Sequence, residues 1–104
     1  MKAKETIAII GATGNIGSPI AANLSKGNYR MILMSRDVEK LSKLKSELSA
    51  GNPNTVIDTN DCEKDVSWEA DVIILAGAYE EEKAIAEKIR DFAIGKIVIS
   101  ISNP

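Results

Sequence analysis

The chain of 104 residues contains no histidine and a single cysteine, Cys62. Without histidine, the chain cannot supply a Ser-His-Asp triad, a histidine general base or a histidine metal ligand of its own. One cysteine cannot form an intrachain disulfide, and a metal site built on it would need other ligands. Histidine-based catalysis, histidine metal sites and an intrachain disulfide are therefore excluded for this chain by itself.

The sequence also lacks a long apolar run and an excess of one charge. No apolar run approaches the ~20 residues that span a bilayer, and the charged N-terminus leads into a strand too short for a signal-peptide core. A net charge of -2 argues against nucleic acid as the main partner. We expect one cytoplasmic domain, residues 1–104, whose partners are small molecules rather than nucleic acid or a membrane.

Three glycines spaced three residues apart, in the segment Gly11–Gly17, follow directly after the apolar run Thr6–Ile10. This order predicts a buried parallel strand, a tight turn and a helix, which is the context of a dinucleotide-binding motif. In this interpretation Gly11 makes the turn, Gly14 lets the backbone approach a bound group, and Gly17 lets the helix pack closely on the strand. The segment therefore predicts a dinucleotide site.

The amides of Gly14, Asn15 and Ile16 are expected to hold the pyrophosphate of that dinucleotide, because amides at a helix start carry partial positive charge. A mononucleotide P-loop does not fit, since that loop ends in Gly-Lys-Ser/Thr, whereas Ser18 and Pro19 follow the last glycine here. A plain strand-to-helix turn without a ligand is the alternative.

Strand and helix patterns alternate along the rest of the chain. Apolar spacing and turn residues predict helices over about 16–26, 38–50 and 80–92, and further strands over 29–34, 55–57, 70–75 and 96–101. For the polar connection 59–67 the pattern predicts neither a helix nor a strand. The buried helix residues are expected to include Val38, Leu41, Leu44, Leu48, Ala84, Ile85, Ile89 and Phe92. This alternation predicts an α/β fold with a Rossmann-type, doubly wound parallel sheet in a single three-layer domain.

Ser35 and Arg36 stand at the tip of the second predicted strand. In dinucleotide folds this position contacts the adenosine ribose, where a carboxylate favours NAD and a 2′-phosphate needs cations. Arg36 offers a planar guanidinium, Ser35 a hydroxyl, and Lys40 lies one helical turn from Arg36 on the same face. These residues predict a 2′-phosphate pocket, and hence NADP(H) as the cofactor.

The charges of this segment also fit two other roles. Arg36 and Lys40 can be solvated charges, because the same helix also carries Lys43 and Lys45. Asp37 can be mistaken for the carboxylate of an NAD site. An aspartate at this place is more simply explained as the cap of the helix that follows.

Together with the strands 71–75 and 97–100, these motifs resemble one family, the NADP oxidoreductases that use the deazaflavin coenzyme F-420. The resemblance covers essentially the whole chain and is to the N-terminal half of such proteins. It implies that Thr13 joins Ser35, Arg36 and Lys40 around the 2′-phosphate. It also implies that hydride passes between NADP(H) and coenzyme F-420.

The turn after the fourth predicted strand, with Ala76, Gly77 and Tyr79, matches the family's segment on the nicotinamide side of the cofactor. Ala78 stands where the family usually has proline. Family members carry a C-terminal lobe that completes the deazaflavin site and a homodimer, and residues 1–104 contain no such lobe. The resemblance thus implies a cofactor-binding domain with an incomplete active site.

An atypical short-chain dehydrogenase-like NADP(H) sensor, which binds the cofactor without turnover, is the alternative function, because such proteins share the glycine spacing. Tyr79 and Lys83 match the Tyr-x-x-x-Lys pair of that family. In that family, however, the pair lies on a later helix, so we assign no catalytic residue in this chain. Equal affinity for oxidised and reduced cofactor without reductase activity would favour the sensor.

Overall fold

The computed structural model describes residues 5–14, 16–27, 29–51, 55–60, 63–76 and 79–101. Within these residues, five parallel strands form one sheet in the order β3-β2-β1-β4-β5. The strands are β1 (Thr6–Ile10), β2 (Arg30–Met34), β3 (Val56–Asn60), β4 (Val72–Leu75) and β5 (Ile97–Ser100). The predicted α/β class with a parallel sheet is confirmed.

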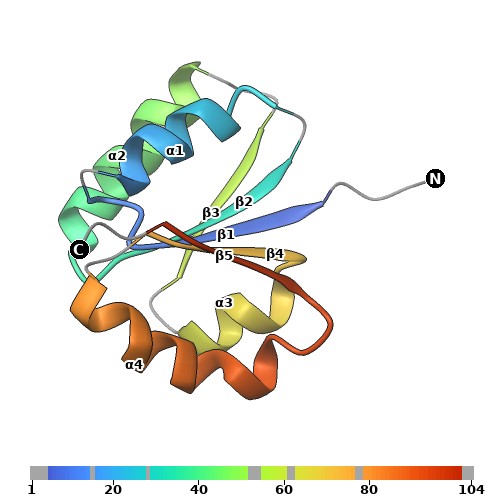
Figure 1. Cartoon of the computed structure of the whole chain (residues 1–104). Coiled ribbons are helices and arrows are strands. Elements are labelled where there is room, and N and C mark those ends of the chain that lie inside the picture. The colour runs from blue at the N-terminus through green and yellow to red at the C-terminus, as the bar shows by residue number, and fades with distance from the viewer. Residues whose placement is uncertain are drawn as a thin grey trace.

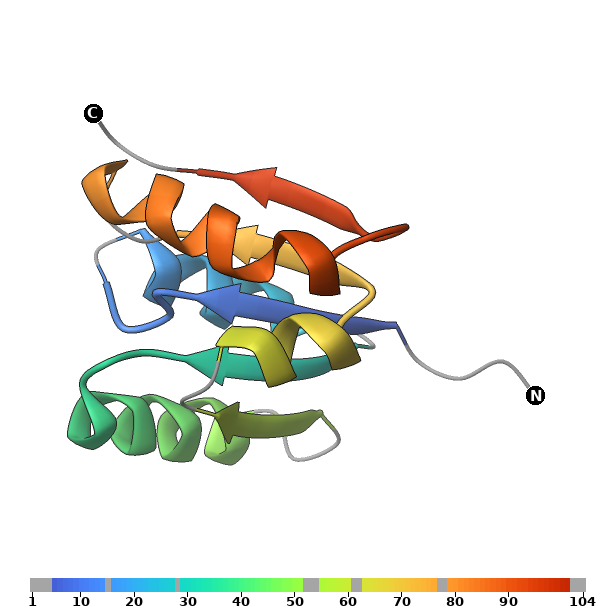
Figure 2. The same cartoon turned by 90° about the horizontal axis from the view of Figure 1, so that it is seen from below.

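Helices cover both faces of this sheet, as Figures 1 and 2 show. On one face lie α1 (Gly17–Leu24) and α2 (Val38–Gly51), and on the other lie α3 (Glu63–Glu69) and α4 (Tyr79–Ile89), which continues into the short 3-10 helix η1 (Arg90–Phe92). The strand order reverses at β1, because β2 follows on one side and β4 on the other. In open α/β sheets, ligands bind outside the carboxyl ends of the strands at such a switch point.

The strand β1 is the centre of the core, and all five of its residues are buried. Ile7 and Ile9 pack in the cluster beneath α1 and α2, whereas Ala8 and Ile10 pack in the cluster beneath α3 and α4. Both faces of the strand are thus removed from water, which is why its apolar run shows no alternation. The buried carboxyl end of β1 leads directly into the glycine turn.

Two predicted core positions are wrong, and two more, Leu44 and Phe92, are only half-buried. Val38 is 64% exposed, because it is the first residue of α2 and lies before the buried stripe of Leu41 and Leu48. Ala84 is exposed, because the buried stripe of α4 runs through its neighbour Ile85. The strand β5 forms as predicted but is exposed along its length, since an edge strand has a neighbour on one side only.

The polar connection 59–67 contains structure that the sequence patterns do not reveal. The strand β3 continues to Asn60, and α3 spans Glu63–Glu69. Val66 and Ser67 are fully buried, but a helix this short shows too few apolar positions for a helical period to be recognised.

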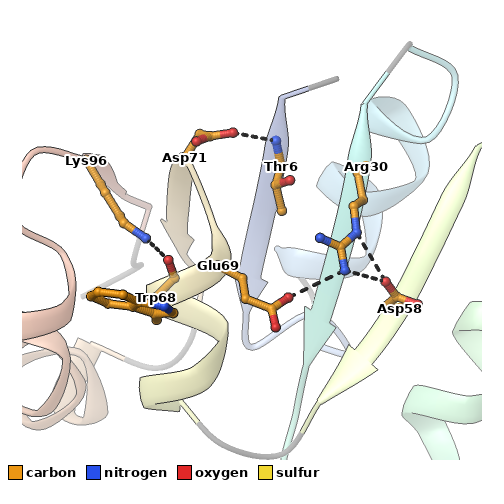
Figure 3. Close-up of polar contacts among 7 residues, drawn as sticks. All are labelled: Thr6, Arg30, Asp58, Trp68, Glu69, Asp71 and Lys96. Carbon is orange, nitrogen blue, oxygen red and sulfur yellow. Dashed lines mark hydrogen bonds and ion pairs between the residues drawn. The ribbon is translucent and has the colours of Figure 1, made fainter. Parts of the chain in front are cut away.

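Polar side chains join the elements at the amino ends of the strands (Figure 3). Arg30 forms ion pairs with Asp58 of β3 at 3.0 Å and with Glu69 of α3 at 3.4 Å. The Thr6 amide donates to the Asp71 carboxylate at 2.9 Å. The ion pairs are partly solvated, so their contribution to stability is small. These contacts lie towards the amino ends of the strands, whereas the glycine turn follows the carboxyl end of β1.

Candidate cofactor site

The turn after β1 is held by the end of β2. Gly11 has a φ of 88°, a left-handed conformation that side-chain-bearing residues rarely adopt. The amides of Gly11 and Ala12 both donate to the carbonyl oxygen of Met34, at 2.9 and 3.0 Å. The prediction that Gly11 makes the turn is therefore confirmed.

Gly14 and Gly17 differ in the space that the surrounding backbone leaves for a side chain. A Cβ on Gly17 would lie 2.2 Å from the carbonyl oxygen of Gly11, so no side chain fits there. A Cβ on Gly14 would lie 3.4 Å from the same oxygen, which is an ordinary contact. Internal packing thus explains Gly17 but not Gly14, and a group that approaches the backbone from outside would explain Gly14.

The start of α1 has amides that are available to an anion. No side chain caps this helix at Ile16. Within the described part of the chain, the amides of Ile16 and Gly17 have no acceptor, whereas the Gly14 amide donates to the Gly11 carbonyl at 3.2 Å. The Gly14 amide is thus used by the turn, and the predicted contact of Asn15 lies outside the described residues.

Thr13 and Ser35 meet at the carboxyl ends of β1 and β2. Their hydroxyl oxygens lie 2.6 Å apart. The two strands pair in register as far as Ile10 and Met34, so the residues that follow each strand come together. Ser35 is 8% exposed, and Thr13 is half-buried. The structure thus joins two of the residues expected around the 2′-phosphate.

The start of α2 carries the predicted cap. The Asp37 carboxylate accepts a hydrogen bond from the Lys40 amide at 3.0 Å, which is a typical N-cap bond. The Asp37 amide in turn donates to the Ser35 hydroxyl at 3.2 Å. The interpretation of Asp37 as a cap is confirmed, and Arg36, which is exposed, lies between these two residues at the tip of β2.

A pocket of about 200 Å³ lies between α1 and α2. Its lining consists of Thr13, Ser18, Lys40, Lys43, Leu44 and Glu47. Thr13 and Lys40, two of the predicted residues, therefore face one cavity. Ser35 and Arg36 do not line it, although the Ser35 hydroxyl contacts that of Thr13. The sequence interpretation missed Lys43 and Glu47, although their spacing from Lys40 puts them on the same face of the helix.

Ala76 lies beside the glycine turn on the side where the nicotinamide is expected. Its amide donates to the carbonyl oxygen of Ile10 at 2.9 Å, and its own carbonyl oxygen would lie 4.0 Å from a Cβ on Gly14. The predicted contacts of Gly77 and of the Tyr79 side chain lie outside the described residues.

The described residues form neither a metal-binding cluster nor a membrane-spanning helix. Across these residues, no group of three or more histidine, cysteine, aspartate or glutamate side chains is placed to hold a metal ion. Nor does the described part of the chain contain a helix that is long and apolar enough to cross a membrane.

Solved structures of dehydrogenases share the fold of this chain. The lactate dehydrogenase of Cryptosporidium parvum superposes with a TM-score of 0.76 at 21% sequence identity, covering 100% of this chain and 39% of that enzyme. A likeness at this identity concerns the fold alone. With the glycine turn at its switch point, the fold is that of a Rossmann-type domain.

The family model described as NADP oxidoreductase, coenzyme F420-dependent, matches residues 6–104. The chain is 33% identical over 106 residues to the F420-dependent NADP reductase of Methanocaldococcus jannaschii, covering 94% of this chain and 45% of that protein. It is 31% identical over 102 residues to the F420-dependent NADP reductase of Methanothermobacter thermautotrophicus, with coverages of 94% and 43%. The chain belongs to this family, and it spans less than half the length of these relatives.

Proposed function

We propose that residues 1–104 form the NADP(H)-binding domain of a cytoplasmic oxidoreductase that transfers hydride between NADP(H) and coenzyme F-420. The observation that carries the proposal is the pair of hydroxyls of Thr13 and Ser35 beside the pocket that Lys40 lines. Hydroxyls and cations together suit a phosphate, and membership of a family described as NADP oxidoreductases points to the same cofactor.

The pyrophosphate is proposed to bind at the start of α1. The amides of Ile16 and Gly17, which have no acceptor within the described residues, support this assignment. The positive end of the helix dipole adds to it. Gly14 would let the phosphate approach the turn, and Asn15 stays a predicted contact.

The 2′-phosphate is proposed to lie among Thr13, Ser35, Arg36 and Lys40. Arg36 would give a bidentate contact, because a guanidinium matches the geometry of phosphate oxygens. The use of the Asp37 carboxylate as a helix cap leaves the ribose side without an acidic partner from this residue, which favours NADP(H) over NAD(H).

The nicotinamide ring is proposed to lie beside Ala76, with Gly77 and Tyr79 as further contacts. When bound, the two cofactors supply the hydride chemistry between their rings. The protein has to align the rings and exclude water, and no acid or base is needed. The partners are therefore small molecules, and a homodimer is proposed for the complete enzyme.

The absorbance of coenzyme F-420 reports hydride transfer, so it distinguishes an oxidoreductase from an NADP(H) sensor. With the full natural protein, addition of NADPH should change the absorbance of the deazaflavin as hydride is transferred. No change would contradict the proposed reaction. If the protein instead bound NADP⁺ and NADPH equally and showed no reductase activity, an NADP(H) sensor would be the better description.

A further inference from the structure

We propose that Lys43 is a specificity-determining residue for NADP(H) and that Glu47 opposes phosphate binding in the same pocket. This inference rests on the proposed function and extends it to two residues of α2 that neither the glycine motif nor the strand tip includes. The pocket between α1 and α2 would then distinguish NADP(H) from NAD(H) by the balance of its charges.

The geometry of α2 brings these side chains together. Lys40, Lys43 and Glu47 follow at intervals of three and four residues and therefore lie on one face of the helix. All three line the pocket, and Thr13 and Ser18 line it from the glycine turn and α1. Lysines 40 and 43 thus share one cavity with a hydroxyl that is expected to contact the 2′-phosphate.

The charges in the pocket are not paired with one another. Within the described residues, no ion pair involves the side chains of Lys40, Lys43 or Glu47. A phosphate monoester carries about -1.5 to -2 charges at neutral pH, so it gains from a second ammonium. A carboxylate in the same cavity repels it by the same rule. Lys43 should therefore strengthen, and Glu47 weaken, binding of the 2′-phosphate.

Solvent limits the size of both effects. Lys43 and Glu47 are exposed, and contacts between exposed charges are weakened by water and salt. We therefore expect a change in affinity of about 3- to 10-fold for removal of Lys43, less than for a bidentate arginine. The effect should shrink as the salt concentration rises.

Titration of the full natural protein tests the inference, with NADPH and NADH as ligands and with 2′,5′-ADP and 5′-AMP as fragments. Lys43→Gln should weaken NADPH and 2′,5′-ADP about 3- to 10-fold and change NADH and 5′-AMP by less than about 2-fold. Lys45→Gln is the matched control, because Lys45 is on the same helix but does not line the pocket. It should alter no affinity by more than about 2-fold. Lys43→Arg should keep the preference for NADPH.

Glu47→Gln tests the second half of the inference. It should tighten NADPH and 2′,5′-ADP by about 2- to 5-fold without affecting NADH. An unchanged NADPH affinity in this variant would overturn the role of Glu47.

The possible outcomes separate this inference from the proposed function. If the wild type prefers NADPH but Lys43→Gln leaves that preference intact, the role of Lys43 is wrong and the proposed function stands. Equal weakening by Lys43→Gln and Lys45→Gln would also overturn it, because the effect would then come from net charge. If the wild type binds NADPH and NADH alike, the assignment to NADP(H) itself fails, and this inference fails with it.

Discussion

The hydroxyl oxygens of Thr13 and Ser35 lie 2.6 Å apart, although 22 positions separate the two residues in the sequence. The Ser35 hydroxyl also accepts from the Asp37 amide at 3.2 Å, so one side chain joins the turn after β1 to the start of α2. Because a hydroxyl hydrogen can rotate towards a new acceptor, both groups can donate to an anion without movement of the backbone.

Thr13→Val tests this pair, because valine keeps the shape of threonine and removes its hydroxyl. We expect NADPH to bind about 10-fold more weakly, since a hydrogen bond to a charged group is lost. NADH affinity should be unchanged. Thr55→Val is the matched control, because the Thr55 hydroxyl donates to the Ser25 carbonyl at 2.7 Å, at the C-terminal end of α1 and not at its start.

Urea unfolding measures the stability of the variants Thr13→Val and Thr55→Val. Each variant should lower the free energy of unfolding by about 0.5–1.5 kcal/mol, the usual loss for a hydrogen bond. Only Thr13→Val should also change NADPH affinity. A similar loss of NADPH affinity in Thr55→Val would show that stability, and not contact with the phosphate, controls binding.

Arg36→Ala tests the choice of cofactor. Loss of the guanidinium should weaken NADP(H) by roughly 10- to 150-fold, because charge-assisted hydrogen bonds to the 2′-phosphate disappear. NAD(H) lacks this phosphate and should be little affected. Arg36→Asp should go further and favour NAD(H), because a carboxylate repels the phosphate and accepts from the ribose hydroxyls. Titration with both cofactors is the measurement, and equal losses for both would make Arg36 a surface charge only.

Gly14→Ala and Gly17→Ala should separate ligand binding from folding. At Gly14 a Cβ meets only ordinary contacts, so the variant should fold normally and bind both NADPH and NADH more weakly. At Gly17 the Cβ would lie 2.2 Å from a backbone oxygen, so this variant should lose more than about 2 kcal/mol of stability. Thermal unfolding and cofactor titration together distinguish the two. Normal NADPH binding by Gly14→Ala would contradict the pyrophosphate assignment.

The parts of the fold that the sequence predicts well are those where one local cause dominates. The unbroken apolar run of β1 and the positive φ required of Gly11 leave few alternatives. The helix α3 could not be predicted in this way, because a buried serine, Ser67, stands where an apolar residue would have marked the period. Likewise, the apolar pattern of β5 predicts a strand, but it does not say that the strand lies exposed at an edge.

In the candidate site, too, local sequence predicts some residues, whereas others depend on tertiary packing. Ser35 and Arg36 could be found because they follow a strand whose end is visible in the sequence. In the sequence, Lys43 cannot be distinguished from a solvated lysine of the same helix. Its proposed role depends on which face of α2 turns towards α1. That packing comes from contacts between residues distant in the sequence. Helical spacing indicates which residues share a face, whereas the neighbouring element decides what that face does.

Lys96 lies just before β5, at the end of the sheet opposite the proposed cofactor site. Its ammonium donates to the carbonyl oxygens of Ser67 and Trp68, and Figure 3 draws the contact with Trp68. Both carbonyls belong to the last turn of α3, where carbonyls lack helical partners. It also lies 5.8 Å from the centre of the Trp68 ring, where a cation is attracted to the aromatic face.

Lys96→Met keeps most of the aliphatic stem and removes the charge and its donors. We expect a loss of about 0.5–1.5 kcal/mol in the free energy of unfolding, because the end of α3 loses a capping cation. The emission of Trp68, the only tryptophan, should shift in the folded state. Lys88→Met is the control, since Lys88 is an exposed lysine in the last turn of α4. Cofactor affinity should be unchanged in both variants; a selective loss of NADPH binding in Lys96→Met would mean that the two edges of the sheet are coupled.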